Sequence, residues 1–274
     1  MFVQRLLTVM IAVPFLVAAL LTSQVWIFKT ICLLSLGLSF FEFLTMAGFS
    51  RAEIRVGLIF GLCHFGILLF DWPFHSSDSH SLLFENTLLL IGIFFSQIIL
   101  KSTSLPNEGA ASAARTALTF FGIHYLSLGV FIARLRDLPE GIFWIFLLLL
   151  MTWLNDTFAY FFGHRFGKRR LAPKISPGKT VEGFLGGYLG TFLGFISCWI
   201  VFGRPISLLH GMLLVLTVGL AGPLGDLSES LLKRSFGVKD SGHVIPGHGG
   251  MLDRIDALLF TAPVVYFWAI YAWK

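Results

Sequence analysis

The hydrophobic pattern of the chain is a series of long apolar runs separated by short polar connections. A transmembrane helix needs about 20 mostly apolar residues, and backbone groups in lipid must be hydrogen-bonded within such a segment. The pattern therefore predicts an all-α integral membrane protein with about nine transmembrane helices. The runs cover residues 6–22, 25–48, 55–72, 82–100, 116–133, 142–162, 180–203, 207–226 and 255–273.

The first run, residues 6–22, has two interpretations. One arginine, an apolar core and small residues near Ala18 and Ala19 imitate a secretory signal peptide. A second long apolar run follows at once, which favours an uncleaved first transmembrane helix.

Positive charges are distributed unequally between the two sides of the membrane. If the N-terminus lies inside, fifteen of the 20 Lys and Arg residues fall on the inner side. Cytoplasmic loops carry this excess in membrane proteins, so the N-terminus is expected in the cytoplasm and the C-terminus outside. The residues left on the outer side are Lys29, Arg134, Arg136, Arg204 and Lys274.

Composition supports the membrane assignment and argues against other classes of protein. Hydrophobic residues make up 56% of the 274 residues and charged residues 13%, against about 25% charged in soluble domains. The three cysteines lie far apart in apolar runs, so neither a disulfide framework nor a zinc site is indicated. The net charge of +5 comes from short loops and reports topology, and no nucleic-acid partner is expected.

Most of the polar chemistry is confined to two connections, residues 155–183 and 225–256. The predicted topology places both on the cytoplasmic side. We therefore divide the chain into N-terminal transmembrane helices, residues 1–110, and a C-terminal transmembrane catalytic region, residues 111–274. The soluble parts are connections and form no separate domain.

The eighth run ends in a regular set of polar residues. Asp226, Glu229, Ser230 and Lys233 follow the spacing i, i+3, i+4, i+7. If the helix continues past the run, these side chains share one face. Glu229 and Lys233 have a second interpretation as a structural ion pair.

More carboxylates are expected at the same membrane depth. Asp253 and Asp256 are three apart at the start of the ninth run, and Asp156 follows Asn155 near the inner end of the sixth. Asp253 has an alternative role as an ion-pair partner of Arg254. Carboxylate oxygens suit a hard cation such as Mg²⁺, which also binds substrate phosphates. Cations that suit phosphate lie nearby: Lys174, Lys179, Lys233, Arg234, Lys239 and Arg254.

The glycines of "PGHGG" directly precede the ninth run. Gly249 and Gly250 can adopt conformations that turn successive backbone N–H groups toward an anion, and the following helix start would add a favourable dipole. An ordinary tight turn with a helix cap explains the same glycines equally well. His248 and His243 are either functional residues or hydrogen-bonding loop residues.

Two other glycine patterns occur near the seventh run. "PGKT" (177–180) resembles the end of a phosphate-binding P-loop, but Pro173 occupies the position of its first glycine and we expect no strand before it. Ser176 and Lys179 can still contact phosphate. Small residues four apart predict a close helix contact, within the chain or between two copies; they are Gly186, Gly190 and Gly194.

Glu42 lies alone near the inner end of the second run. An acid within a membrane span is a candidate functional residue. It could instead extend to the interface or pair with Arg51, and the residues leave its role open.

The stretch from Ser230 to Asp256 resembles the signature of the phosphatidate cytidylyltransferases, or CDP-diacylglycerol synthases. That pattern is Ser-x-x-Lys-Arg, four residues, Lys-Asp-x-Gly, then Ile-Pro-x-His-Gly-Gly-x-x-Asp-Arg-x-Asp, and the sequence follows it without departure. Residues 155–156, 176–183 and 225–230 resemble further features of the family. The specific similarity covers about the C-terminal 120 residues.

The resemblance implies an integral membrane enzyme that joins CTP to phosphatidic acid and releases pyrophosphate. It also implies Mg²⁺ as the cofactor, with a second cation left open, and a homodimer. Short loops suggest a bacterial inner membrane with the active site facing the cytoplasm.

Roles follow from the resemblance and from the chemistry of the residues. Asp226 and Asp253 are assigned as primary metal ligands and Asp256 as a supporting one. The catalytic set is Asp226, Asp253, Asp256, Lys233 and Arg254. The substrate-binding set is Asn155, Asp156, Ser176, Lys179, Ser230, Arg234, Lys239, His248, Gly249 and Gly250.

Two alternative functions remain open at this stage. A cytidylyltransferase acting on another lipid phosphate would have the same loop residues. An ion-coupled transporter would also combine many spans with buried acids, but transporters place such acids near the bilayer midplane between repeats. In this chain the acids are predicted in loops on one side of the membrane, and no internal repeat is evident.

Overall fold

The computed structural model describes residue 10 and residues 14–70, 108–203, 206–244 and 249–272. Within them, seven helices are long and apolar enough to cross a membrane. The prediction of an all-α membrane protein is therefore confirmed. The predicted span 82–100 and most of the span 6–22 lie outside the described residues, so the count of nine stays a prediction.

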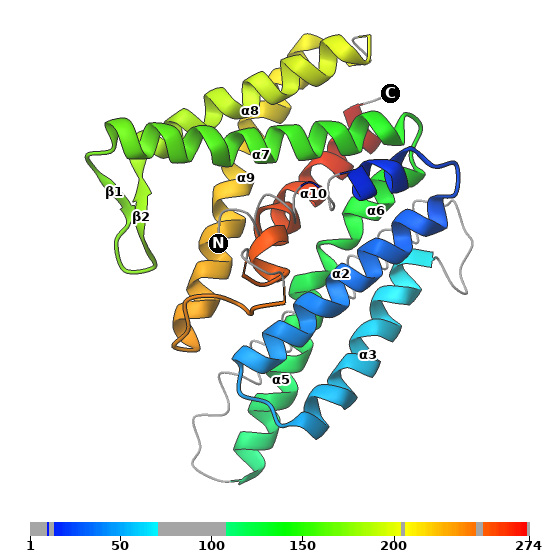
Figure 1. Cartoon of the computed structure of the whole chain (residues 1–274), viewed down its shortest axis with the longest axis vertical. Helices are drawn as coiled ribbons and strands as arrows, with labels where there is room; N and C mark the ends of the chain where they lie inside the picture. The colour runs from blue at the N-terminus through cyan, green and yellow to red at the C-terminus, as the bar shows by residue number, and fades with distance from the viewer. Residues whose placement is uncertain (1–9, 11–13, 71–107, 204–205, 245–248, 273–274) are drawn as a thin grey trace.

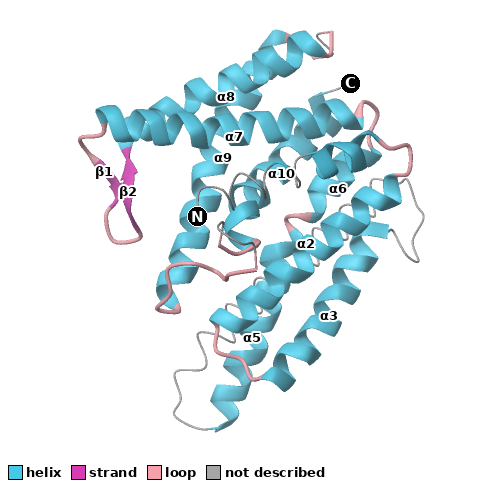
Figure 2. Cartoon of the chain, viewed as in Figure 1, coloured by secondary structure: helices cyan, strands magenta, loops and turns pink. Residues whose placement is uncertain are grey.

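Helices make up nearly all of the described structure (Figures 1 and 2). Each apolar run within the described residues falls on helical structure, and the run 116–133 covers two successive helices that together form one candidate span, Ala113–Asp137. The elements are α2 (Val25–Met46), α3 (Arg51–Phe70), α5 (Glu108–Ser127), α6 (Val130–Asp137), α7 (Gly141–Phe166), β1 (Arg170–Ala172), β2 (Ser176–Thr180), α8 (Val181–Val201), α9 (Leu208–Ser235) and α10 (Leu252–Ala272).

The helices form two groups that meet at α10. In Figure 1, α2, α3 and α5 lie side by side, and α7 runs along α8. Helix α10 contacts α9 and α7 from one group and α2, α5 and α6 from the other. Helix α10 therefore lies where the two groups of helices come together.

Large apolar side chains face outward on several helices. On α8, Leu185, Leu189 and Leu193 are exposed at intervals of one helical turn, and on α9 Leu216 and Leu220 are exposed in the same way. Soluble proteins rarely expose large contiguous apolar patches. Lipid contact accounts for these faces.

Helix α9 differs most from the predicted run. The apolar run ends at Asp226, but the helix continues to Ser235. The extension includes Glu229, Ser230 and Lys233, and it is stable because these polar side chains contact one another and the start of α10. The conditional prediction of a continuing helix is thus confirmed.

The expectation that no strand lies near "PGKT" is wrong. Strand β2 (Ser176–Thr180) pairs antiparallel with β1, with Arg170 opposite Thr180. The hairpin is attached to α8, because the Glu182 carboxylate accepts the backbone N–H groups of Lys168 and Arg169 at 2.9 and 3.2 Å. Apolar periodicity could not predict this hairpin, because polar side chains and backbone hydrogen bonds form it.

The small-residue pattern on α8 is an internal contact. A Cβ atom at Gly186 would clash with Phe162 of α7, and one at Gly190 would clash with the backbone carbonyl of Leu154. Helices approach this closely only where side chains are absent. The predicted seam is confirmed within the chain, and it fixes α7 against α8.

Candidate functional site

Three carboxylates from α9 and α10 form the centre of the site. Asp226, Glu229 and Asp256 each offer an oxygen within 4.8 Å of the others. Gly225 permits this approach, because a Cβ there would lie 2.5 Å from the backbone oxygen of Asp256. Spacing along each helix places these acids on facing sides of α9 and α10.

Lys233 joins this group to Asp253. Its Nζ lies 2.5 Å from Glu229 Oε2 and 2.7 Å from Asp253 Oδ1. The Lys233 side chain is 13% exposed and that of Glu229 is 1% exposed, so the ion pair is largely buried. The interpretation of Glu229 and Lys233 as an ion pair is confirmed, and the structure pairs Asp253 with Lys233.

A second lysine reaches the centre from the hairpin. Lys179, on β2, places its Nζ 2.6 Å from Asp226 Oδ2. Ser230, one turn beyond Asp226 on α9, donates its hydroxyl to Asp226 Oδ1 at 3.3 Å. Residues from the two predicted loops therefore meet at one carboxylate.

We call the four acids and two lysines the acid cluster; it consists of Asp226, Glu229, Asp253, Asp256, Lys179 and Lys233. Carboxylates outnumber ammonium groups two to one in it. Both oxygens of Glu229 are buried and, apart from the ionic contact with Lys233, have no hydrogen-bond donor among the described residues. Partly buried carboxylates in excess, with free oxygen valence at Glu229, suit a hard divalent cation.

Asp253 is held more firmly than the other acids. Its Oδ2 accepts the backbone N–H of Gly250 at 2.9 Å, and the backbone N–H and the hydroxyl of Ser241 at 3.1 and 2.9 Å. Asp253 stands in the first turn of α10 and so satisfies a backbone donor ahead of the helix.

A cavity of about 630 Å³ opens beside the acid cluster. Helix α7, the hairpin, the start of α8 and Asp226 line it. Predicted site residues in its wall are Asn155, Asp156, Ser176, Lys179 and Asp226, and residues not predicted there include Tyr160, His164 and Arg170. The sequence pattern does not single out these three residues, because they line one cavity only when the hairpin lies beside α7.

Asn155 is fixed within the wall of this cavity. It is 1% exposed, and its side-chain N–H donates to Thr191 of α8 at 2.8 Å. Its Oδ1 is buried and has no hydrogen-bond partner among the described residues.

The remaining predicted residues lie around the cluster or outside the described residues. Arg234 donates to the backbone oxygens of Ile175 and Val238, at 3.5 and 3.1 Å. Lys239 and Arg254 are exposed. Gly249 has a φ of +82°, a backbone conformation that glycine adopts readily because it has no Cβ atom. His248 lies outside the described residues.

A second, larger cavity of about 880 Å³ lies between α3 and α5. Its wall is mainly apolar and contains no predicted site residue. The acid cluster is the stronger candidate for the functional site, because the charged groups converge there.

Fold and site together define a polytopic membrane protein with a partly buried acidic cluster next to a cavity lined by basic residues, a combination suited to metal-assisted phosphoryl transfer. The model of the cytidylyltransferase family matches residues 3–272. The chain belongs to this family, and within it to the phosphatidate cytidylyltransferases described next.

Similar proteins bear that name in several bacteria. The phosphatidate cytidylyltransferase of Staphylococcus saprophyticus is 37% identical over 200 residues, which cover 73% of this chain and 75% of that protein. That of Bacillus subtilis is 44% identical over 135 residues, about half of each chain. That of Staphylococcus aureus strain COL is 39% identical over 175 residues, 63% of this chain and 66% of the relative.

Proposed function

We propose that this chain condenses CTP with phosphatidic acid to give CDP-diacylglycerol and pyrophosphate. Family membership supports the activity. The observation that carries the chemistry is the meeting of Asp226, Glu229 and Asp256 with Lys179 and Lys233 beside a cavity large enough for a nucleotide.

The proposed cofactor is Mg²⁺, and the donor set fits it. Asp226 and Asp256 would hold the ion together with Glu229, whose oxygens have free valence. Asp253 is proposed as a further ligand, for this ion or for a second cation, once Lys233 transfers its contact to a substrate phosphate. Bound Mg²⁺ would neutralise phosphate charge and orient the phosphate oxygens.

The reaction needs little proton chemistry from the chain. An oxygen of the lipid phosphate, already an anion, forms a bond to the α-phosphorus of CTP, and the bond from that phosphorus to the pyrophosphate oxygen breaks. The tasks of the protein are alignment and charge compensation. Lys179 and Lys233 would move from their carboxylates to the phosphates, and Ser230 would orient Asp226.

The outer cations would guide and hold the anionic substrates. Arg254 and Lys239 are exposed near the start of α10 and the end of α9, and Arg234 lies next to the hairpin. Ser176, Asn155 and Asp156 would line the opposite wall. Gly249, Gly250 and His248 are proposed to border the phosphate, with the Gly249 N–H as a donor, while the Gly250 N–H holds Asp253.

Further proposals concern the setting of the enzyme. We propose a bacterial inner-membrane homodimer with a cytoplasmic N-terminus and an outer C-terminus. The site then faces the cytoplasm, where CTP is available. The division at residue 110 is also retained as a proposal, with the catalytic region after it.

Purified protein in detergent provides the direct test. Phosphatidic acid, Mg²⁺ and a panel of nucleotides would be supplied, and pyrophosphate release followed. We expect release that requires both CTP or dCTP and phosphatidic acid and stops when EDTA removes the metal. Equal release with another lipid phosphate would redirect the assignment, and absence of release from the wild-type chain would refute it.

A further inference from the structure

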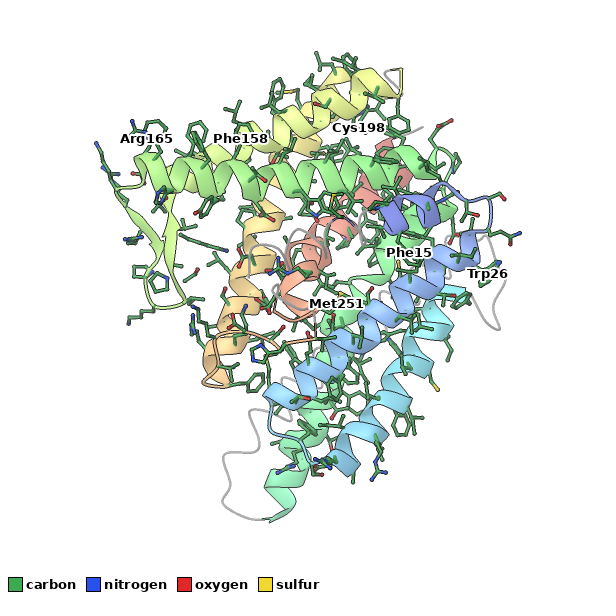
Figure 3. All side chains as sticks on the ribbon, in the orientation of Figure 1. Phe15, Trp26, Phe158, Arg165, Cys198 and Met251 are labelled. Carbon is green, nitrogen blue, oxygen red and sulfur yellow. The ribbon has the colours of Figure 1, made fainter. Side chains whose placement is uncertain are left out.

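Glu42 is a buried acid that the reaction scheme leaves unused. It lies on α2, and 2% of its surface is exposed. Its Oε1 accepts the backbone N–H of Met251 and its Oε2 that of Leu252, both at 2.9 Å. Figure 3 labels Met251 at the start of α10, next to α2. The acid therefore contacts a segment about 200 residues away in the sequence.

This contact satisfies the start of α10. The first N–H groups of a helix have no partner within the helix, and the positive end of the helix dipole favours a carboxylate there. A cap usually comes from the same segment of chain. Here a different transmembrane helix supplies it, and the N–H groups in turn satisfy a carboxylate that would be costly to bury alone.

Ser241 connects Glu42 to Asp253. Its hydroxyl oxygen lies 3.2 Å from Glu42 Oε2 and 2.9 Å from Asp253 Oδ2. Because a hydroxyl has one hydrogen, it donates to one carboxylate at a time. Ser241 is 4% exposed, so water does not easily replace it.

The chain around Glu42 leaves no room for side chains. A Cβ at Gly242 would lie 2.8 Å from Glu42 Oε1, and one at Gly250 would lie 2.6 Å from Glu42 Oε2. Both glycines precede α10 and Asp253 in the chain. The chain at these glycines is therefore closely fitted to this carboxylate.

We propose that Glu42 is a positioning residue, which holds the start of α10 and, through Ser241, sets the orientation of Asp253 in the acid cluster. The inference rests on the proposed function, because Asp253 is a site residue only if the cluster performs the reaction. It assigns to a helix of the N-terminal region a defined task in catalysis.

The informative substitution is Glu42→Gln. The amide keeps the size of the side chain but has only one oxygen acceptor, and its NH₂ group would face a backbone donor. Displacement of a reacting group by about 1 Å can cost roughly 100-fold in rate. We expect kcat to fall about ten-fold or more, the KM for phosphatidic acid to change little, and the Mg²⁺ concentration for half-maximal rate to rise.

Glu53→Gln is the matched control. Glu53 is an acid of α3, is 37% exposed and pairs with Arg115 away from the cluster, so its variant should retain the wild-type rate. Ser241→Ala removes the hydroxyl between Glu42 and Asp253 but leaves both backbone contacts of Glu42 and the Ser241 N–H on Asp253, so it tests the inference where Glu42→Gln does not fold.

The outcomes separate the inference from the function. Folded Glu42→Gln with kcat within about two-fold of Glu53→Gln would overturn the inference, since an acid with only a structural role lowers stability and not turnover per folded molecule. Unchanged kcat in Ser241→Ala would overturn it as well. An inactive wild type would instead refute the proposed function.

Discussion

Replacement of Lys233 by methionine is the most informative single change in the acid cluster. Met keeps the apolar length of the side chain and removes the ammonium group that contacts Glu229 and Asp253. Removal of one partner from a buried ion pair typically costs about 3–5 kcal/mol, because a buried charge is left uncompensated. Two carboxylates lose their partner here, and both are at most 10% exposed, so we expect a loss within that range.

Arg115→Met provides a comparison on a different surface. Arg115 pairs with Glu53, and the two side chains are 48% and 37% exposed. Exposed pairs contribute about 0–1 kcal/mol. The two variants therefore differ in burial while both remove one cation from an ion pair.

Equilibrium unfolding in mixed detergent micelles, followed by circular dichroism without Mg²⁺, measures the difference. We expect Lys233→Met to lose at least about 2 kcal/mol more than Arg115→Met. Equal losses would refute the view that Lys233 compensates buried charge, and would imply that water or a proton neutralises these acids.

Further expectations concern the metal group, the helix seam and the hairpin lysine. Asp226→Asn and Asp256→Asn should each lower pyrophosphate release by more than about 100-fold, since even residues behind metal ligands cost 10–100-fold; near-normal turnover in a correctly inserted variant contradicts the ligand assignment. Gly190→Leu should cost at least about 1–3 kcal/mol through overpacking against α7, whereas Gly66→Ala, with open space around it, should be neutral or stabilising in the same unfolding assay. Lys179→Met should raise the KM for CTP, and an unchanged KM would remove Lys179 from the phosphate site.

Local spacing predicted the parts of the site that lie along one helix. The contacts of Ser230 with Asp226 and of Lys233 with Glu229 confirm the shared face on α9. The lengths of the apolar runs likewise predicted helices, because the thickness of the membrane sets the length of a transmembrane helix and of its apolar run. These features depend on residues fewer than five positions apart or on one continuous segment.

Contacts between distant segments could not be predicted in the same way. Glu42 is separated from Leu252 by 210 positions, and no periodicity relates them. Its burial follows from the packing of α2 against α10, which the sequence pattern leaves open. The hairpin that supplies Lys179 was missed for a related reason: its strands are short and polar, and the attachment to α8 depends on Glu182.

The lysines of the cluster contact the carboxylates that are proposed to bind Mg²⁺. Lys233 neutralises carboxylates that would bind Mg²⁺, so ammonium and metal compete for them, while the same ammonium would attract phosphate. Lys233→Met should therefore bind Mg²⁺ more tightly and CTP more weakly than the wild type. Stabilisation against unfolding as a function of Mg²⁺ concentration reports the first, and CTP dependence of the rate at saturating Mg²⁺ reports the second. If the affinities of Lys233→Met for Mg²⁺ and for CTP both rise or both fall, Lys233 does not move from the carboxylates to a substrate phosphate.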